Sequence, residues 1–131
     1  MEQPRNKEKI LSAGTLLFVA CWAAYCASYL GRINYTAALT AIVADGVFSK
    51  SHAGFIGTVY FFCYGAGQIF SGILGDRVSP YKMVGTGLVG TVCANILMPL
   101  CSGSYIVMSV VWGVNGIVQS MLWTPILYII S

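Results

Sequence analysis

The chain has 131 residues, of which 57% are hydrophobic and only 8% are charged, and its mean hydropathy is +0.77. A soluble domain carries about 25% charged residues, so this chain lacks the polar surface of a water-soluble protein and belongs to the membrane class. The formal net charge of +3 does not indicate a nucleic-acid partner, because the basic residues stand at the ends of apolar segments rather than in one patch.

Four long apolar segments predict an all-α polytopic membrane protein with four transmembrane helices. A helix needs roughly 20 apolar residues to cross the hydrocarbon core of a bilayer. The first segment follows a polar tail over residues 1–10 and exceeds the roughly 7–15 apolar residues of a signal peptide, which indicates a retained helix in a transmembrane region over residues 11–131. The helices are expected at about residues 11–44, 52–74, 83–101 and 105–130.

The distribution of Lys and Arg predicts the orientation of the chain. The N-terminal tail carries Arg5, Lys7 and Lys9, and the loop over residues 76–82 carries two further cations. The opposite side of the membrane has only Lys50. Because cytoplasmic loops carry an excess of Lys and Arg, we expect both termini and the loop to be cytoplasmic, in a plasma (inner) membrane protein whose surroundings are the lipid bilayer.

Arg32 is the one charge within an apolar segment. A charged side chain at a helix centre costs roughly 2.5–3.5 kcal/mol on insertion scales and avoids lipid. Tyr25, Tyr29, Arg32 and Thr36 follow helical spacing, so they share one polar and aromatic face. The guanidinium can bind a phosphate or a carboxylate with two hydrogen bonds. Alternatively, the side chain extends along the helix to the outer membrane surface.

The other polar side chains of the apolar segments are weaker signals. They recur at helical spacing on the second and fourth segments: Tyr60, Tyr64 and Gln68, and Asn115, Gln119 and Trp123. Such groups either line a cavity or hydrogen-bond between helices, which contributes about 1 kcal/mol each. The five Cys residues form no CxxC pair, so we expect no disulfide, metal or cofactor. The sequence contains no catalytic constellation and no phosphate-binding loop, so nothing in it indicates an enzyme.

The loop between the second and third segments reads Gly72-x-x-x-Asp76-Arg77, followed by the basic Lys82. This pattern resembles the loop motif of the major facilitator superfamily. The resemblance implies that Gly72, Asp76, Arg77 and Lys82 form a latch between the two halves of a transporter. The simpler alternative is that Asp76 and Arg77 end a helix and anchor it by charge. Both roles are compatible.

Two further motifs lie on the first and fourth predicted helices. They read Tyr29-x-x-Arg32-x-Asn34-Tyr35 and Asn115-Gly116-x-x-Gln119-Ser120-x-x-Trp123-x-Pro125. Both are similar to motifs of the organophosphate:phosphate antiporter branch of this superfamily, so three motifs occur in order along essentially the whole chain.

The resemblance implies a carrier of small organic anions with twelve helices in two halves. The substrate of such a carrier sits between the halves, and alternating access rocks one half against the other. Arg32 matches the first-half arginine that holds the substrate phosphate. With it, we predict a substrate site that includes Tyr29, Tyr35, Tyr64 and Gln119, and a small anionic solute, namely an organophosphate, phosphate or a carboxylate, as the partner.

The chain departs from the branch pattern at several positions. Ile33 stands where some phosphate-ester carriers have a second basic residue, and Ser79 and Tyr81 replace the usual Asn and Arg of the loop motif. Tyr128 and its neighbours lack the arginine that often follows the fourth-helix Pro. A sugar acid or another carboxylate is therefore an alternative substrate, since Arg32 would hold either anion.

The length matches roughly the first third of such a carrier. We expect a truncated transporter that lacks its C-terminal half as a partner and does not transport alone. Two alternatives remain open. The first is a small transporter that self-assembles from four-helix chains, although no segment carries the carboxylate that proton coupling often uses. The second is a membrane sensor that binds its ligand without transporting it.

Overall fold

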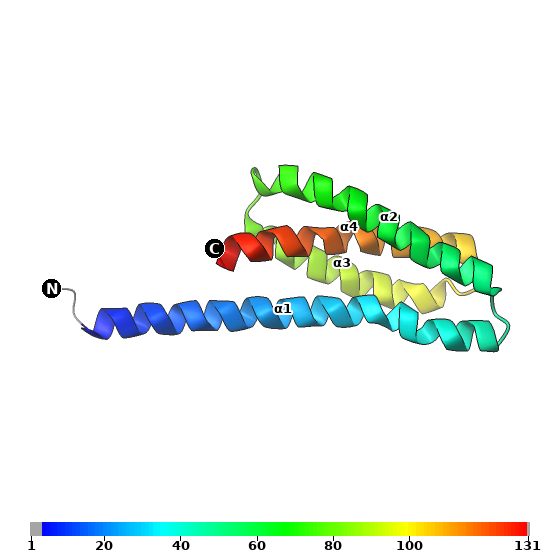
Figure 1. Ribbon diagram of the computed structural model, residues 1–131, viewed down its shortest axis with the longest axis horizontal. Coiled ribbons are helices and arrows are strands. Elements are labelled where there is room, and N and C mark those ends of the chain that lie inside the picture. Colours follow the sequence, from blue (N-terminus) through cyan, green and yellow to red (C-terminus); the bar gives the residue numbers. More distant parts are fainter. Residues whose placement is uncertain (1–3, 131) are drawn as a thin grey trace.

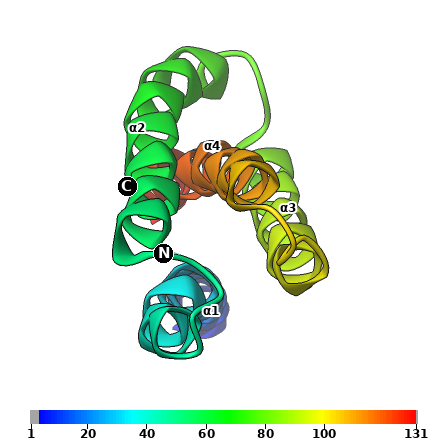
Figure 2. The same ribbon diagram turned by 90° about the vertical axis from the view of Figure 1, so that its right-hand side faces the viewer.

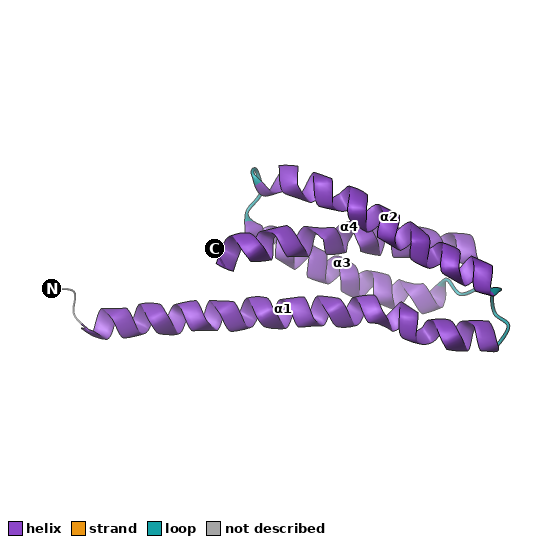
Figure 3. Cartoon of the chain, viewed as in Figure 1, coloured by secondary structure: helices purple, strands orange, loops and turns teal. Residues whose placement is uncertain are grey.

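The computed structural model describes residues 4–130, and the side chains of residues 12–129. Within residues 4–130 the chain forms four helices and no strand (Figures 1 and 3). They are α1 (Pro4–Ala44), α2 (Lys50–Gly75), α3 (Pro80–Leu100) and α4 (Tyr105–Ile130). Each contains a stretch long and apolar enough to cross a membrane: Ser12–Ala44, Lys50–Gly75, Pro80–Leu100 and Tyr105–Ile129. The predicted all-α fold with four transmembrane helices is confirmed.

The helix boundaries follow local sequence signals. Ser49 is the N-cap of α2, and its hydroxyl oxygen accepts a hydrogen bond from the backbone N–H of His52 at 3.3 Å, as serine commonly does at this position. Pro80 opens α3, where its missing N–H is harmless, so α3 begins before the expected residue 83. The helix α1 begins at Pro4, whereas the sequence pattern predicts a polar tail over residues 1–10; residues 1–3 lie outside the described part.

The helix α4 lies at the centre of the molecule. The end-on view in Figure 2 shows α2 and α3 on either side of α4, with α1 below them. The helices α2 and α3 pack closely on α4, and α1 touches the other three much less. On α1, Leu16 and Trp22 are 72% and 62% exposed.

Small residues allow the close packing of α2 and α3 on α4. A Cβ atom added to Gly116 of α4 would lie 2.5 Å from the carbonyl oxygen of Tyr60 on α2. A Cβ atom added to Gly87 of α3 would lie 2.7 Å from Cγ of Leu122 on α4. Both distances are shorter than a real Cβ contact allows, so glycine is required where the helices approach most closely.

Candidate functional site

The guanidinium of Arg32 lies against three aromatic rings of α2. Its Cζ atom is 5.6 Å from the ring centroid of Tyr60 and 5.2 Å from those of Phe61 and Tyr64. Cation–π contacts of this kind contribute about 0.5–1 kcal/mol at exposed sites and about 2 kcal/mol or more when desolvated. These rings occupy the middle turns of Lys50–Gly75. The contacts therefore direct Arg32 across the bundle, toward the middle of α2.

Arg32 has no carboxylate partner among the side chains of residues 12–129. The side chain is only half-buried, so one side of the guanidinium remains accessible. Aromatic rings stabilise the cation without neutralising its charge. The group can therefore accept an anionic ligand with its full positive charge.

A small recess surrounds this cation and brings together most of the predicted site residues. It has a volume of about 30 Å³, and its walls come from α1, α2 and α4. The lining residues are Tyr25, Ser28, Tyr29, Arg32, Tyr64, Gln119, Leu122 and Trp123. Four of the five residues predicted for the substrate site, Arg32, Tyr29, Tyr64 and Gln119, thus meet at one place.

The outer wall of the recess is aromatic and open. Tyr25 lies 5.3 Å from Trp123 and 6.2 Å from Tyr29 between ring centroids. The exposed fraction is 38% for Tyr25, 42% for Trp123 and 48% for Tyr29. The sequence places Tyr25 and Trp123 on the first and fourth helices, but it does not show that their rings are in contact.

Beneath the recess lies a buried chain of hydrogen bonds. The hydroxyl of Tyr60 donates to Oε1 of Gln119 at 2.6 Å, and Nε2 of Gln119 donates to the backbone carbonyl of Ser28 at 3.2 Å. Tyr60 and Gln119 are 2% and 4% exposed. The chain joins α2, α4 and α1 immediately below Arg32. Sequence reasoning placed Tyr60 only among the weaker signals, because helical spacing does not reveal the partner of a hydroxyl.

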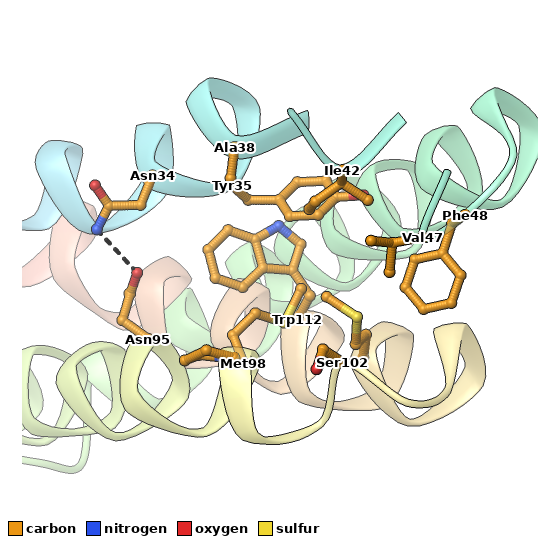
Figure 4. A pocket seen from close by; sticks show the side chains of 12 residues that line it. Asn34, Tyr35, Ala38, Ile42, Val47, Phe48, Asn95, Met98, Ser102 and Trp112 are labelled. Atoms are coloured by element: carbon orange, nitrogen blue, oxygen red, sulfur yellow. Dashed lines mark hydrogen bonds between the residues drawn. The ribbon is translucent and has the colours of Figure 1, made fainter. Parts of the chain in front are cut away.

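Tyr35 is the predicted site residue that lies apart from the others. Its hydroxyl donates to the carbonyl oxygen of Ala53 at 2.6 Å, and its ring centroid is 5.4 Å from that of Trp112. It lines a separate, mainly apolar cavity of about 450 Å³ near the α1–α2 loop (Figure 4). The cavity is bounded on one side by a hydrogen bond from Asn34 to Asn95, which is drawn in Figure 4.

The turn of α1 that carries Arg32 is tied to the rest of the bundle by its backbone. Nδ2 of Asn95 donates to the carbonyl of Gly31 at 3.0 Å, one turn from the Ser28 carbonyl that Gln119 binds. A Cβ atom added to Gly31 would lie 2.6 Å from Cγ2 of Thr91 on α3. Glycine at this position therefore lets α1 approach α3 and bring Arg32 over the α2 rings.

The loop-motif residues lie at the C-terminal end of α2, in the following turn and at the start of α3. Gly72, Asp76, Arg77 and Lys82 are all exposed. The backbone N–H of Arg77 donates to the carbonyl of Leu74 at 3.0 Å, which closes the helix end. A recess of about 290 Å³ opens beside this turn, with Gly72, Asp76 and Pro80 on one wall and Pro125 of α4 on another.

Comparison with known proteins places the chain in a family. The family model described as "Major Facilitator Superfamily" matches residues 21–131. A probable hexose phosphate transport protein of Chlamydia pneumoniae is 31% identical over 109 residues, which cover 83% of this chain and 24% of that protein. No solved structure matches the chain.

Two other relatives extend the comparison. The membrane sensor protein UhpC of Escherichia coli is 33% identical over 79% of this chain and 23% of its own length. The glycerol-3-phosphate transporter of Bacillus subtilis is 30% identical over 83% of this chain and 25% of its own length. The chain spans about a quarter of the length of these relatives. The match over most of the chain shows that it belongs to the major facilitator superfamily, in the branch of its organophosphate transporters.

Proposed function

We propose that this chain provides the phosphate-binding part of a secondary transporter for small phosphate esters, with Arg32 as the residue that holds the phosphate. The observation that carries the proposal is the position of Arg32. Its charge is unpaired among the described side chains, half-buried, and held on the rings of Tyr60, Phe61 and Tyr64 in the middle of a transmembrane helix. A cation at this depth is retained for a ligand rather than for stability.

The side chains around the recess suit the phosphoryl end of an ester, and the volume of about 30 Å³ admits only a small part of such a ligand. The guanidinium can donate two parallel hydrogen bonds to phosphate oxygens, and the low dielectric of the membrane interior strengthens this attraction. The half-exposed rings of Tyr25, Tyr29 and Trp123 offer an aromatic wall against which the organic group of the ester can lie. A carboxylate would also bind, but its single negative charge gains less from Arg32 than a phosphate dianion does.

The remaining parts of the proposal concern the whole transporter. The relatives are about four times longer than the matched region, and we place the opposite side of the substrate site in that further part of the protein. In alternating access, that further part would rock against these four helices, and the exposed Asp76 and Arg77 would act as a latch between the two. The chain alone then binds its ligand without transporting it. Both termini lie on the cytoplasmic side of the plasma (inner) membrane.

A binding experiment tests the role of Arg32. The chain is incorporated into lipid nanodiscs and titrated with glycerol 3-phosphate, with glycerol and glycerate as comparison ligands. We expect glycerol 3-phosphate to bind at least tenfold more tightly than glycerate, and Arg32→Gln to abolish the difference. Lys82→Gln, which removes an exposed cation from the loop, is the matched control. Equal binding by Arg32→Gln and the unchanged chain would refute the assignment.

A sensor is the second candidate, since the relative UhpC is named a membrane sensor protein. A sensor would use the same recess to bind the ester but would not move it. Exchange of labelled phosphate by proteoliposomes distinguishes the two functions when the chain is present together with the rest of its transporter. Binding without exchange favours the sensor, and exchange that depends on Arg32 favours the carrier.

A further inference from the structure

Gln119 is among the residues expected to touch the substrate, but both polar atoms of its side chain are already engaged. Oε1 accepts the Tyr60 hydroxyl at 2.6 Å, and Nε2 donates to the Ser28 carbonyl at 3.2 Å. The side chain is 4% exposed. Each polar atom of the amide keeps one further hydrogen-bonding position, but a side chain that is 4% exposed and tied to two helices presents little of either atom to a ligand.

We propose that Gln119 and Tyr60 are positioning residues, which fix the guanidinium of Arg32 in place without touching the substrate. The inference deepens the proposed function and rests on it for its consequence in ligand binding. Gln119 holds the ring on which Arg32 lies, and it also holds the backbone of α1 one turn before Arg32.

The contacts of Tyr60 explain how one amide can set the position of the cation. The Tyr60 ring lies 5.6 Å from the Trp112 ring and is stacked on Tyr64 at 6.1 Å with an interplanar angle of 18°. One end of the residue is thus packed among rings, and the hydroxyl end is fixed by Gln119. Arg32 rests over this same ring. If the hydroxyl loses its partner, it must find another, because an unpaired hydroxyl is costly in a membrane interior.

The substitution Gln119→Leu therefore removes two hydrogen bonds together. The Tyr60 ring rotates until its hydroxyl reaches a new acceptor, and the Ser28 carbonyl loses the hydrogen bond that ties α1 to α4. Both changes move Arg32 relative to the rings. Since the missing amide contacts no ligand, the loss of affinity should be the same for inorganic phosphate and for glycerol 3-phosphate.

Nuclear magnetic resonance of arginine side chains reports the position of Arg32 directly. The chain, labelled with ¹⁵N-arginine and held in nanodiscs, should give an Arg32 Nε–Hε signal that is shifted upfield by the currents of the three rings. Arg32→Lys identifies the signal. We expect Gln119→Leu to remove the ring-current shift. Adding Tyr60→Phe to Gln119→Leu should restore part of it, because removing both partners of a buried hydrogen bond leaves no group unsatisfied.

Asn115→Leu is the matched control. Asn115 lies one turn before Gln119 on α4, is 0% exposed, and has no hydrogen-bond partner for either polar side-chain atom among the described residues. Its substitution should leave the Arg32 signal unchanged, and circular dichroism should show that both variants remain helical. If Gln119→Leu leaves the Arg32 signal in place, or if Asn115→Leu moves it as far, the inference is overturned.

Titration with inorganic phosphate separates this inference from the proposed function. If the unchanged chain binds phosphate, Gln119→Leu should weaken binding about tenfold for phosphate and for glycerol 3-phosphate alike. A loss confined to glycerol 3-phosphate would show that Gln119 touches the organic group and would overturn a positioning role. If the unchanged chain binds neither ligand while Gln119→Leu still displaces the Arg32 signal, the proposed function fails and the structural core of the inference stands.

Discussion

Replacement of Gly31 by alanine should separate α1 from α3 and displace Arg32. A Cβ atom at this position would lie 2.6 Å from Cγ2 of Thr91, whereas ordinary contact begins at 3.4 Å, so α1 or the buried Thr91 side chain must move by about 0.8 Å. A displacement of this size would stretch the Asn95–Gly31 hydrogen bond, which is 3.0 Å long, beyond the usual range for N–H···O bonds. Overpacking of this kind costs about 1–3 kcal/mol.

The measurement is the free energy of unfolding in a lipid or detergent environment, together with the affinity for glycerol 3-phosphate. We expect Gly31→Ala to lower both. Thr91→Ala removes the methyl group that the new Cβ would strike, so the double substitution should recover most of the lost stability. A favourable coupling free energy of about 1 kcal/mol between the two positions is expected, since residues in contact are not additive.

Gly14→Ala provides the matched control on the same helix. Nothing lies within 4 Å of a Cβ atom added to Gly14, so the substitution should be neutral or stabilise α1 by about 0.5–1 kcal/mol through helix propensity. The reasoning is refuted if Gly31→Ala is as well tolerated as Gly14→Ala, or if Thr91→Ala fails to rescue it.

Three further substitutions test other contacts. Gly116→Ala should destabilise the α2–α4 pair by about 1–3 kcal/mol in thermal unfolding, because its Cβ would meet the carbonyl of Tyr60 at 2.5 Å; equal melting temperatures would contradict this. Tyr35→Phe removes the hydrogen bond to Ala53 and should cost about 1 kcal/mol of stability while ligand affinity stays the same in titration. Arg32→Lys keeps the charge but loses the planar fork, so we expect about tenfold weaker binding of glycerol 3-phosphate by equilibrium dialysis.

Much of the fold could be predicted because each helix is specified locally. Apolar length predicted the four spans, although α3 begins at Pro80 rather than at the expected residue 83. Helical spacing also placed Tyr29 on the same face as Arg32. All of these signals lie within one segment, and hydropathy reports them without knowledge of neighbouring helices.

The arrangement between helices could not be predicted in the same way. Tyr35 shares a motif with Arg32, yet its hydroxyl binds Ala53 of α2 and its ring meets Trp112 of α4. Tyr60 gave only a weak signal, although it lies under the cation and binds Gln119. Periodicity shows which residues share a face, but the partner of that face depends on how the helices pack.

The attachment of α1 has a mechanical consequence. Hydrogen bonds hold α1 to the other helices at Ser28 and Gly31 and again at Asn34 and Tyr35, whereas apolar contacts on the part of α1 before Ser28 can slide because they have no fixed direction. Such a helix can pivot as a rigid rod about the turn beside Arg32. At a rise of 1.5 Å per residue, the arm from Ser12 to Gly31 is about 28 Å long, so a rotation of about 5° would swing its end by about 2.5 Å. Arg32, which lies beside the pivot, would scarcely move.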